Sequence, residues 1–386
     1  MKLGKTALWF VVIALGVLPL FSFAEKSIDL YNASALVVNQ TAGVRRQAAI
    51  NALATVIVRV AGNKQVLQHP DVSNAVKNAS QYLYEFSYRS TDKTITIAGA
   101  PQPATQLIMR FSQAPLEALL RNAQLPLWSS NRPDILLWTA INRGGKNYVS
   151  SESPMGEALK LAASNRGLPI VSPLLDLEDR SALSVSRLWA LDEGSVRVAS
   201  QRYQTDAVLA GRFIQGRKQW TGSFILLHQG KTHYFTAVGN RQAAAATSIV
   251  DQVSDYFANI YAIVPSASSD LRSVLLQVNN VNNFAFYTAV LDYLEKSKLV
   301  DNVALTTVSA EKMLVRANLN TDLERFLKSL ELDKKLQRVN QDDNVSNPPL
   351  TELSVSLTQS PTVEVVDSAV EQSVVERPLE FVWQPL

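Results

Sequence analysis

Residues 135–141 read Ile-Leu-Leu-Trp-Thr-Ala-Ile, and this nearly all-apolar run decides how the centre of the chain folds. A strand is apolar at successive positions where both of its faces are covered, as in the parallel sheets of α/β proteins. A helical pattern over Met155–Asn165 follows, Gly167 suits its left-handed C-cap, and Leu168–Val171 is then a short second strand. The alternation of strand and helix predicts parallel pairing around residues 135–141.

An antiparallel meander and one long helix are predicted after this unit. The strand-like runs are Asp206–Ile214, Trp220–His228 and His233–Val238. A Gly230-Lys231 turn is expected between the last two, because Gly at the first central position suits a type II′ hairpin. That turn would place His228 opposite His233 on one face of the hairpin. With the helix Arg241–Val264 packed on the sheet, residues 131–264 are predicted to form an α/β domain.

Shorter patterns of strand and helix flank this domain on both sides. Residues 25–130 show the order strand, helix, strand, strand, helix, which predicts an α+β domain. The same order returns in residues 265–338, a small βαββα domain whose last helix is expected to start at a Thr321-x-x-Glu324 capping box. No convincing residue-level repeat links the two regions. The predicted fold class is α+β and α/β, with small mixed-sheet modules in tandem.

Residues 339–386 differ from the body of the chain in composition. They hold eight acidic residues against Arg377 alone, and Asn, Ser, Thr, Gln and Pro dominate, so we expect a disordered acidic tail. The segment 379–386 ends this tail with an aromatic tip that contains Phe381 and Trp383. Apolar groups at the tip of a solvated tail suit a docking peptide, which adds a strand to a partner or fills its groove. Folding back onto the body, or no role at all, are the alternatives.

Residues 1–24 have the three parts of a secretory signal peptide. Lys2 and Lys5 form the positive start, Ala7–Phe21 is apolar apart from Gly16 and Pro19, and Ser22-Phe23-Ala24 places small residues before a cut. We therefore expect cleavage after Ala24 and export to the periplasm. An uncleaved anchor is the alternative. Because no Cys follows the apolar run, the pattern is not that of a lipoprotein.

Composition excludes several classes of chemistry. With no Cys and three His in 386 residues, the chain cannot use disulfides, thiolate catalysis, zinc fingers or iron–sulfur clusters. Neither Gly-x-Ser-x-Gly nor Gly-x-Gly-x-x-Gly occurs. Residues 211–218, GRFIQGRK, have the glycine spacing of a phosphate loop, but Arg217 replaces its Lys and the segment joins two strands. No catalytic residue and no cofactor is predicted, and an enzyme is the less favoured reading.

The distribution of charge bears on possible partners. After the expected cleavage, residues 25–338 hold 34 basic and 26 acidic residues, so the body is mildly basic. This excess suits weak contact with anionic polymers or a membrane surface, although solvated surface charge is the favoured explanation. Nucleic acid is not expected as a partner, because the basic residues are not clustered with aromatic residues.

Two groups of residues are candidates for a functional site. Asp176, Glu178 and Asp179 follow the short strand 168–171, near the carboxyl edge where α/β sheets bind ligands, and their oxygens could hold Ca²⁺ or Mg²⁺. The group lacks the spacing of a calcium loop, and Arg166 and Arg180 offer ion pairs, so capping and turn roles are the alternative. Partner binding is the second possibility, and its candidate residues are Trp128, Arg132, Phe381 and Trp383. Core packing is the alternative for the first two.

Three strings carry a resemblance to a known family: LPLWSSNRPDILLWTAI (125–141), NRGLPIVSPLLDLEDRSALS (165–184) and ASQRYQTDAVLAGRF (199–213). Together with the leader they resemble the domain-of-unknown-function 2066 family of exported gammaproteobacterial proteins, over roughly residues 28–264. The resemblance implies export to a Gram-negative periplasm and supplies no reaction or catalytic residue. The middle domain more loosely resembles α/β modules of envelope accessory proteins, namely the N-terminal module of the Tol-system protein B and the outer-membrane activators of penicillin-binding proteins.

The leading hypothesis is therefore a non-enzymatic accessory or scaffold protein of the periplasm that binds an envelope protein. One alternative is a carboxylate-dependent hydrolase, or a divalent-cation-binding protein, that acts on cell-wall material through Asp176, Glu178 and Asp179. A second alternative is a module that binds peptidoglycan or lipid headgroups through the basic body.

Overall fold

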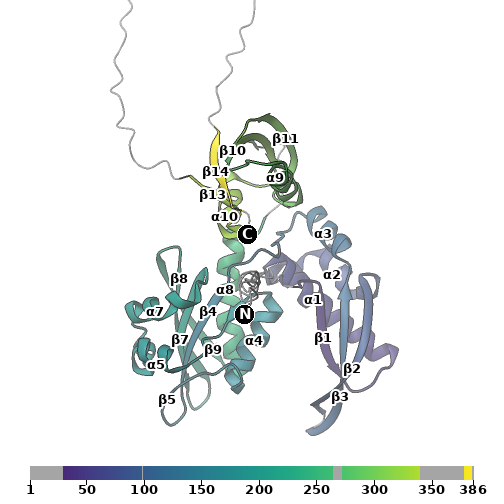
Figure 1. The fold of residues 1–386 in the computed structure, drawn as a ribbon. Helices are drawn as coiled ribbons and strands as arrows, with labels where there is room; N and C mark the ends of the chain where they lie inside the picture. The colour runs from purple at the N-terminus through teal and green to yellow at the C-terminus, as the bar shows by residue number, and fades with distance from the viewer. Residues whose placement is uncertain (1–28, 98, 264–271, 340–377, 385–386) are drawn as a thin grey trace, which may run out of the picture.

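The computed structural model describes residues 29–97, 99–263, 272–339 and 378–384, and these form three modules in tandem (Figure 1). The first module covers residues 29–127, the second 128–263, and the third 272–339 together with 378–384. Each is a sheet with helices packed on it, so the predicted fold class of tandem α+β modules is confirmed. None of the described helices combines the length and apolarity that a membrane span requires.

The first module packs its helices on one face of an antiparallel sheet with the order β1-β3-β2. Its elements are β1 (Asn32–Val37), α1 (Ala42–Ala61), α2 (Pro70–Lys77), β2 (Leu83–Ile97), β3 (Ala100–Phe111) and α3 (Gln113–Asn122), with 3₁₀ turns at Lys64–Gln68 and Ala79–Gln81. Helix α1 forms because Leu53, Ile57 and Val60 recur at helical spacing, and they bury against Leu107 and Leu116. The order of elements agrees with the prediction. The β2–β3 hairpin is longer than expected.

The second module is built on a mixed sheet with the order β5-β4-β7-β8-β9, and β6 pairs with β4. Its elements are β4 (Ile135–Asn142), β5 (Lys146–Tyr148), α4 (Pro154–Arg166), β6 (Ile170–Val171), α5 (Leu177–Ala182), α6 (Val185–Ala190), α7 (Glu193–Ser200), β7 (Ala207–Gln215), β8 (Trp220–His228), β9 (Lys231–Gly239) and α8 (Gln242–Tyr261), with a 3₁₀ turn at Gln201–Tyr203.

Strand β4 lies inside that sheet, between β5 and β7, and is buried from Ile135 to Ala140. It runs parallel to β6 and β7, as its apolar sequence predicted. Its odd-numbered residues Ile135 and Leu137 bury against α4 and α8, whereas Trp138 and Ala140 bury against α6 and α7. The helices α5, α6 and α7, which cover this second face, were not predicted.

The β8–β9 hairpin differs from the prediction by one residue. Its central residues are Gln229 and Gly230, with φ of 47° and 73°, and not Gly230 and Lys231. Two positive φ values in sequence belong to a type I′ turn, whose twist matches that of the flanking strands. His228 therefore pairs with Lys231, and His233 pairs with Leu226. The two imidazoles are diagonal neighbours on one face instead of a directly opposed pair.

The third module contains β10 (Arg272–Asn279), α9 (Phe284–Lys296), β11 (Val300–Val308), β12 (Lys312–Leu319), α10 (Leu323–Asp333), β13 (Leu336–Arg338) and β14 (Leu379–Trp383). Helix α10 starts one residue later than expected, because Asp322 and not Thr321 is its N-cap. The Asp322 carboxylate accepts from the Arg325 amide at 3.0 Å. From β10 to β13 the elements follow the βαββαβ order of ferredoxin-like domains, one strand more than the predicted βαββα.

The segment expected as an aromatic tip is a strand of this third sheet. The sheet has the order β11-β12-β10-β14-β13, with β14 parallel to β10 and antiparallel to β13. The prediction that residues 339–386 form one disordered tail is therefore wrong for 378–384. Period-2 alternation of Leu379, Phe381 and Trp383 gives β14 one apolar face, which the core of the third module covers. Residues 340–377 lie outside the described part of the chain.

Helix α8 joins the three modules along the middle of the molecule (Figure 1). After it, Ile263 exchanges two backbone hydrogen bonds with Leu127, at 2.7 and 2.9 Å, and so ties the end of the second module to the end of the first. The third module is attached by Arg325, which donates to the carbonyl of Ala262, and by an ion pair between Lys298 and Glu117.

The first and third modules share a sheet order as well as an element order. In both, the first strand lies beside the third and the third beside the second: β1-β3-β2 in one, β10-β12-β11 in the other. The modules differ at the outer edge of the first strand. Strand β14 covers that edge of β10, whereas in the described part of the chain β1 pairs with β3 alone.

Candidate functional site: an open strand edge in a groove

The predicted partner-binding residues Trp128 and Arg132 lie in a buried joint between the first two modules. The Arg132 guanidinium donates to the carbonyls of Arg59 at 2.7 Å, Arg166 at 2.8 Å and Gly167 at 3.0 Å, and it stacks on the Trp128 ring at 4.0 Å. The first two carbonyls belong to the last turns of α1 and α4, where the helix dipole favours a cation. Burial lowers the pKa of Arg132 to about 9. Both side chains are buried, so their contacts in this structure are those of packing at the joint, which was the alternative interpretation. A role in partner binding stays a prediction.

The other two partner-binding candidates, Phe381 and Trp383, belong to the core of the third module. They are 1% and 5% exposed in β14. Folding back, one of the alternatives for the tip, is what the structure shows. A partner could contact these rings only if β14 left its place in the sheet.

The carboxylates Asp176, Glu178 and Asp179 lie close together around the start of α5, but Arg202 occupies the space between them. Its Nη1 lies 3.1, 3.4 and 3.0 Å from their respective oxygens. Asp179 is 1% exposed, and it also accepts from the amide of Leu175 and the hydroxyl of Tyr203, both at 2.7 Å.

Asp176 is the N-cap of α5, so its oxygens are also used. It accepts from the Asp179 amide at 2.9 Å, and this bond, followed by the Arg202 contact, lowers the pKa of Asp176. Arg202 takes the role that the sequence suggested for Arg166 and Arg180. Within the described ranges no group of three or more His, Cys, Asp or Glu side chains could hold a metal ion. The arrangement is that of an ion-paired helix start.

Sequence reasoning missed a hydrogen-bonded row of rings under the β8–β9 hairpin. The Tyr256 hydroxyl lies 3.0 Å from His233 Nε2 and 3.0 Å from His228 Nδ1, and Tyr261 lies 3.1 Å from His228 Nε2. The only feature of the sequence that pointed to this group was the pair of His residues near the expected hairpin turn. Burial lowers the pKa of His228 to about 4, so its ring is neutral at pH 7.

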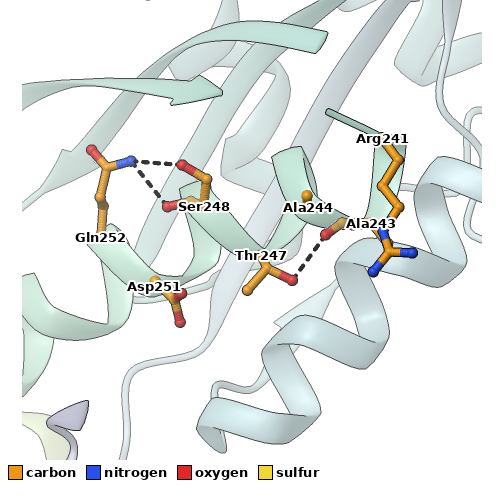
Figure 2. Close-up of a pocket in the computed structure, with 7 residues that line it drawn as sticks. All are labelled: Arg241, Ala243, Ala244, Thr247, Ser248, Asp251 and Gln252. Atoms are coloured by element: carbon orange, nitrogen blue, oxygen red, sulfur yellow. Dashed lines mark hydrogen bonds between the residues drawn. The ribbon is translucent and has the colours of Figure 1, made fainter. Parts of the chain in front are cut away.

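A shallow hollow lies along α8, and most of its lining residues are polar. Figure 2 shows the side chains that line it, among them Thr247, Ser248 and Gln252. Thr247 donates to the carbonyl of Ala243 at 2.8 Å, and Gln252 donates to the carbonyl of Ser248 at 2.9 Å. Gln252 also donates to the Thr236 carbonyl of β9 at 2.8 Å, and Asp251, another lining residue, pairs with Lys64 and Arg166. Because these groups already have partners within the protein, the hollow offers a ligand little to recognise.

A groove of about 700 Å³ runs along the free edge of β1, where the first module faces α4 of the second. Figure 1 shows β1 on this side of its sheet. Small residues of β1 and α1 form part of its lining, and larger apolar side chains stand around it: Ala33, Ala35, Ala48, Ile97, Ile108 and Leu161. Leu36 and Leu161 are 37% and 64% exposed. We call this surface the β1 groove.

The β1 groove presents almost no charge. Arg59 is the only charged residue among those that line it, and its Nη1 is turned inward, where it donates to the carbonyls of Leu30 at 3.2 Å and Asn32 at 2.7 Å. Burial lowers the pKa of Arg59, although Asp29 opposes the shift. These bonds fix the start of β1, and the accessible polar groups of the groove are amides and hydroxyls.

The backbone of β1 has hydrogen-bonding groups that point into the groove. Tyr31 accepts from the Phe111 amide at 3.0 Å, which fixes the phase of the β1–β3 ladder. In an antiparallel ladder bonded and non-bonded pairs alternate, so the N–H and C=O groups of Ser34 and Leu36 point away from β3. Asn32 is in the same phase, and its carbonyl accepts from Arg59.

Strand β1 also lacks the features that usually protect a sheet edge. The described outer strands β2, β5, β9, β11 and β13 each carry charge, for example Arg89, Lys146, Lys231, Asp301 and Arg338. Strand β6, which pairs with β4 alone, carries no charge but is only two residues long. The sequence of β1, Asn-Ala-Ser-Ala-Leu-Val, has neither a charge nor a Pro. Charged residues and Pro discourage the pairing of an edge with another chain, so β1 is the edge most open to strand addition.

Comparison with known proteins gives one partial match. Residues 24–129 match the model of a family described as Domain of unknown function (DUF8605), and this range spans the described first module. It is a different family from the domain-of-unknown-function 2066 family that the strings at 125–213 resemble, so that resemblance stays a prediction. No curated protein and no solved structure matches the chain.

Proposed function

We propose that this chain is a partner-binding accessory protein of the cell envelope, which captures an extended segment of another protein by adding it as a strand to β1. The observation that carries the proposal is the open, uncharged edge of β1 in the groove defined above. Ser34 and Leu36 offer backbone donors and acceptors, and such main-chain bonds supply the affinity in strand addition.

The lining of the β1 groove indicates the chemistry of the partner. Without an accessible charge, the groove suits an uncharged segment with apolar residues at alternate positions, because one face of an added strand would contact the small side chains Ala48 and Ala52 of α1. The third module offers a precedent in the same chain, since β14 adds to the equivalent edge of β10 as a parallel strand. We therefore expect the bound segment to resemble β14 in its alternation.

The cellular part of the proposal depends on the leader, which lies outside the described residues. An accessory protein of the periplasm should lose residues 1–24, so we expect the mature form in that compartment to begin at Glu25. N-terminal sequencing of the protein from fractionated cells tests this. A full-length form recovered from the cytosol alone would remove the envelope from the proposal and leave strand capture to be judged separately.

Peptide selection followed by amide hydrogen exchange tests strand capture. The purified mature chain would be used to select from a random peptide library, and we expect the selected peptides to share alternating apolar residues and few charges. On addition of such a peptide, the amides of Ser34 and Leu36 should exchange more slowly, because they become bonded to it. The affinity should change little with salt, in contrast to binding of an anionic polymer by the basic body.

Edge variants supply the controls. Ser34→Pro removes an outward N–H without taking a bond from β3, and Leu36→Lys places a charge on the edge, so each should weaken peptide binding at least tenfold. Tyr234→Lys is the matched control, because Tyr234 is 77% exposed on β9 and lies outside the groove. The proposal is wrong if Ser34→Pro binds as the parent does, or if both β1 amides already exchange slowly in the free protein.

A further inference from the structure

Strand β14 is the last of the described strands in the sequence, yet it lies inside the third sheet and not at its edge. Strands β10 to β13 belong to a βαββαβ unit, in which β13 would complete the sheet by lying beside β10. Here β14 lies between them, parallel to β10 over Leu276–Asn279 and antiparallel to β13. A strand that follows β13 only after the long segment 339–378 therefore fills an internal place in the sheet. We call this place, between β10 and β13, the β14 slot.

The contacts in the β14 slot define what it accepts. Phe381 and Trp383 enter the core, and the Trp383 ring lies 5.9 Å from that of Tyr293. The strand is also held by its backbone, since the Trp383 carbonyl accepts from Asn280 Nδ2 at 3.0 Å and the Glu380 carbonyl accepts from the Val339 amide at 3.0 Å. The slot thus recognises an extended segment with apolar residues at alternate positions, two of them aromatic.

The connection to β14 is far longer than this arrangement needs. Strands β13 and β14 are antiparallel neighbours, and a hairpin loop of about two to five residues joins such strands. In this chain the whole of 339–378 separates Arg338 from Leu379. A longer connection lowers the effective concentration of β14 at its own slot, and it lets β14 reach the slot of another molecule.

We propose that β14 is an exchangeable strand, and that the β14 slot of one copy takes β14 from a second copy of this chain. The same contacts form within one chain and between two, so the length of the connection decides the balance between them. For a connection of this length the effective concentration is roughly a millimolar, so single chains should dominate at micromolar concentration and exchanged dimers should form near a millimolar. Exchange should be slow, because Phe381 and Trp383 must first leave the core.

Single cysteines test the proposal without background, because the chain has no Cys. Gln277 and Glu380 are paired across β10 and β14. One copy would carry Gln277→Cys and another Glu380→Cys, and the two would be unfolded and refolded together at high concentration under oxidation. A disulfide-linked heterodimer can then form where β14 has exchanged. We expect such a dimer, and none when Tyr234→Cys replaces Glu380→Cys.

A shortened connection provides the matched variant. Deletion of 343–374 leaves only 339–342 and 375–378 between Arg338 and Leu379, so β14 should favour its own slot about tenfold more and the heterodimer yield should fall accordingly. The double variant Gln277→Cys/Glu380→Cys in one chain shows whether the paired positions can form the bond. If they cannot, Asn279→Cys with Val382→Cys replaces them.

Two results would overturn the proposal. One is the absence of the mixed disulfide although the double variant closes within a single chain. The other is an equal yield of dimer from the full and the shortened connection. Native mass spectrometry of refolded mixtures of isotope-labelled and unlabelled chains gives a second measurement that needs no substitution, and there too a lack of mixed dimers at high concentration counts against exchange. Neither result bears on the β1 groove, since that site is in another module.

Discussion

At the scale of single residues, burial gives charged and polar side chains a role that sequence alone does not reveal. Arg132 lies between two Trp residues in the sequence, a setting that suggested recognition, yet its guanidinium bonds to carbonyls at the ends of two helices. Asp176 and Asp179 have the composition of a cation site, yet Arg202, which comes after two further helices, neutralises them. In each case the deciding partner is far away in the sequence.

The buried imidazole of His228 predicts a dependence of stability on pH. Burial is the main cause that lowers its pKa from 6.5 to about 4, the charges of His233 and Lys328 lower it further, and the carboxylate of Asp206 opposes the shift. Between these two pH values the imidazole binds a proton in the unfolded state but not in the folded state. The contribution of His228 to the free energy of unfolding is therefore fully present above pH 6.5 and is lost as the pH falls towards 4. The free energy of unfolding should fall by up to about 3 kcal/mol over this pH range.

Urea unfolding of the parent and of His228→Gln at pH 7 and pH 4.5 measures this effect. The variant should show a smaller decrease in the free energy of unfolding between the two values of pH, by about 2 kcal/mol or more. His69→Gln is the control, because His69 lies at the start of α2, where its side chain is 34% exposed. If the free energy of unfolding depends equally on pH in the parent and in His228→Gln, His228 is not the cause of the loss of stability.

At the scale of elements, a substitution in β14 should have a large effect on stability, although the sequence around this strand has the composition of a tail. Phe381→Ala should lower the free energy of unfolding of the third module by about 3–5 kcal/mol, because the ring is 1% exposed in the core. Phe284→Ala on α9 removes the same group from a site that is 78% exposed, and it should cost less than about 1 kcal/mol. Similar small effects for both variants, in denaturant titrations followed by Trp fluorescence, would show that β14 does not pack as described.

The same elements show how much of the fold the sequence could predict. Helix α1 and strand β4 were predicted because their patterns are local: apolar residues at helical spacing in one, and an unbroken apolar run in the other. Strand β14 was not predicted, because its place in the sheet depends on pairing with β10, which lies far earlier in the chain. The helices α5 to α7 are short and carry little periodic signal, so the second face of the central sheet was also missed.

The candidate site was predictable to a smaller extent than the fold. The segment that contains β1 was expected to be a strand, but its register and free edge depend on β3, which follows only after α1, α2 and β2. What the sequence does show in advance is the absence of Lys, Arg, Asp, Glu and Pro between Asn32 and Val37. Such an uncharged strand becomes informative only once the sheet order identifies it as an edge.

At the scale of the whole molecule, the first two modules should respond as one body, because they pack closely at Gly62. This residue ends α1 with φ of 74°, and a Cβ atom there would lie 2.6 Å from Ala258 Cβ on α8 and 2.9 Å from the Trp128 ring. Two costs therefore add in Gly62→Ala. The left-handed backbone costs about 1–2 kcal/mol, and the contact with the second module adds about 1–3 kcal/mol.

Gly144→Ala separates these two costs. Gly144 has the same φ of 74°, and a Cβ atom there would meet nothing within 4 Å, so this variant should show the backbone cost alone. The excess loss of stability in Gly62→Ala, measured by urea titration, then reports the contact between the modules. If the joint couples them, spectroscopic probes in the first and second modules should shift to lower urea together. An equal loss in the two variants, or a shift confined to the first module, would mean that the modules unfold independently and that the β1 groove is free to change width.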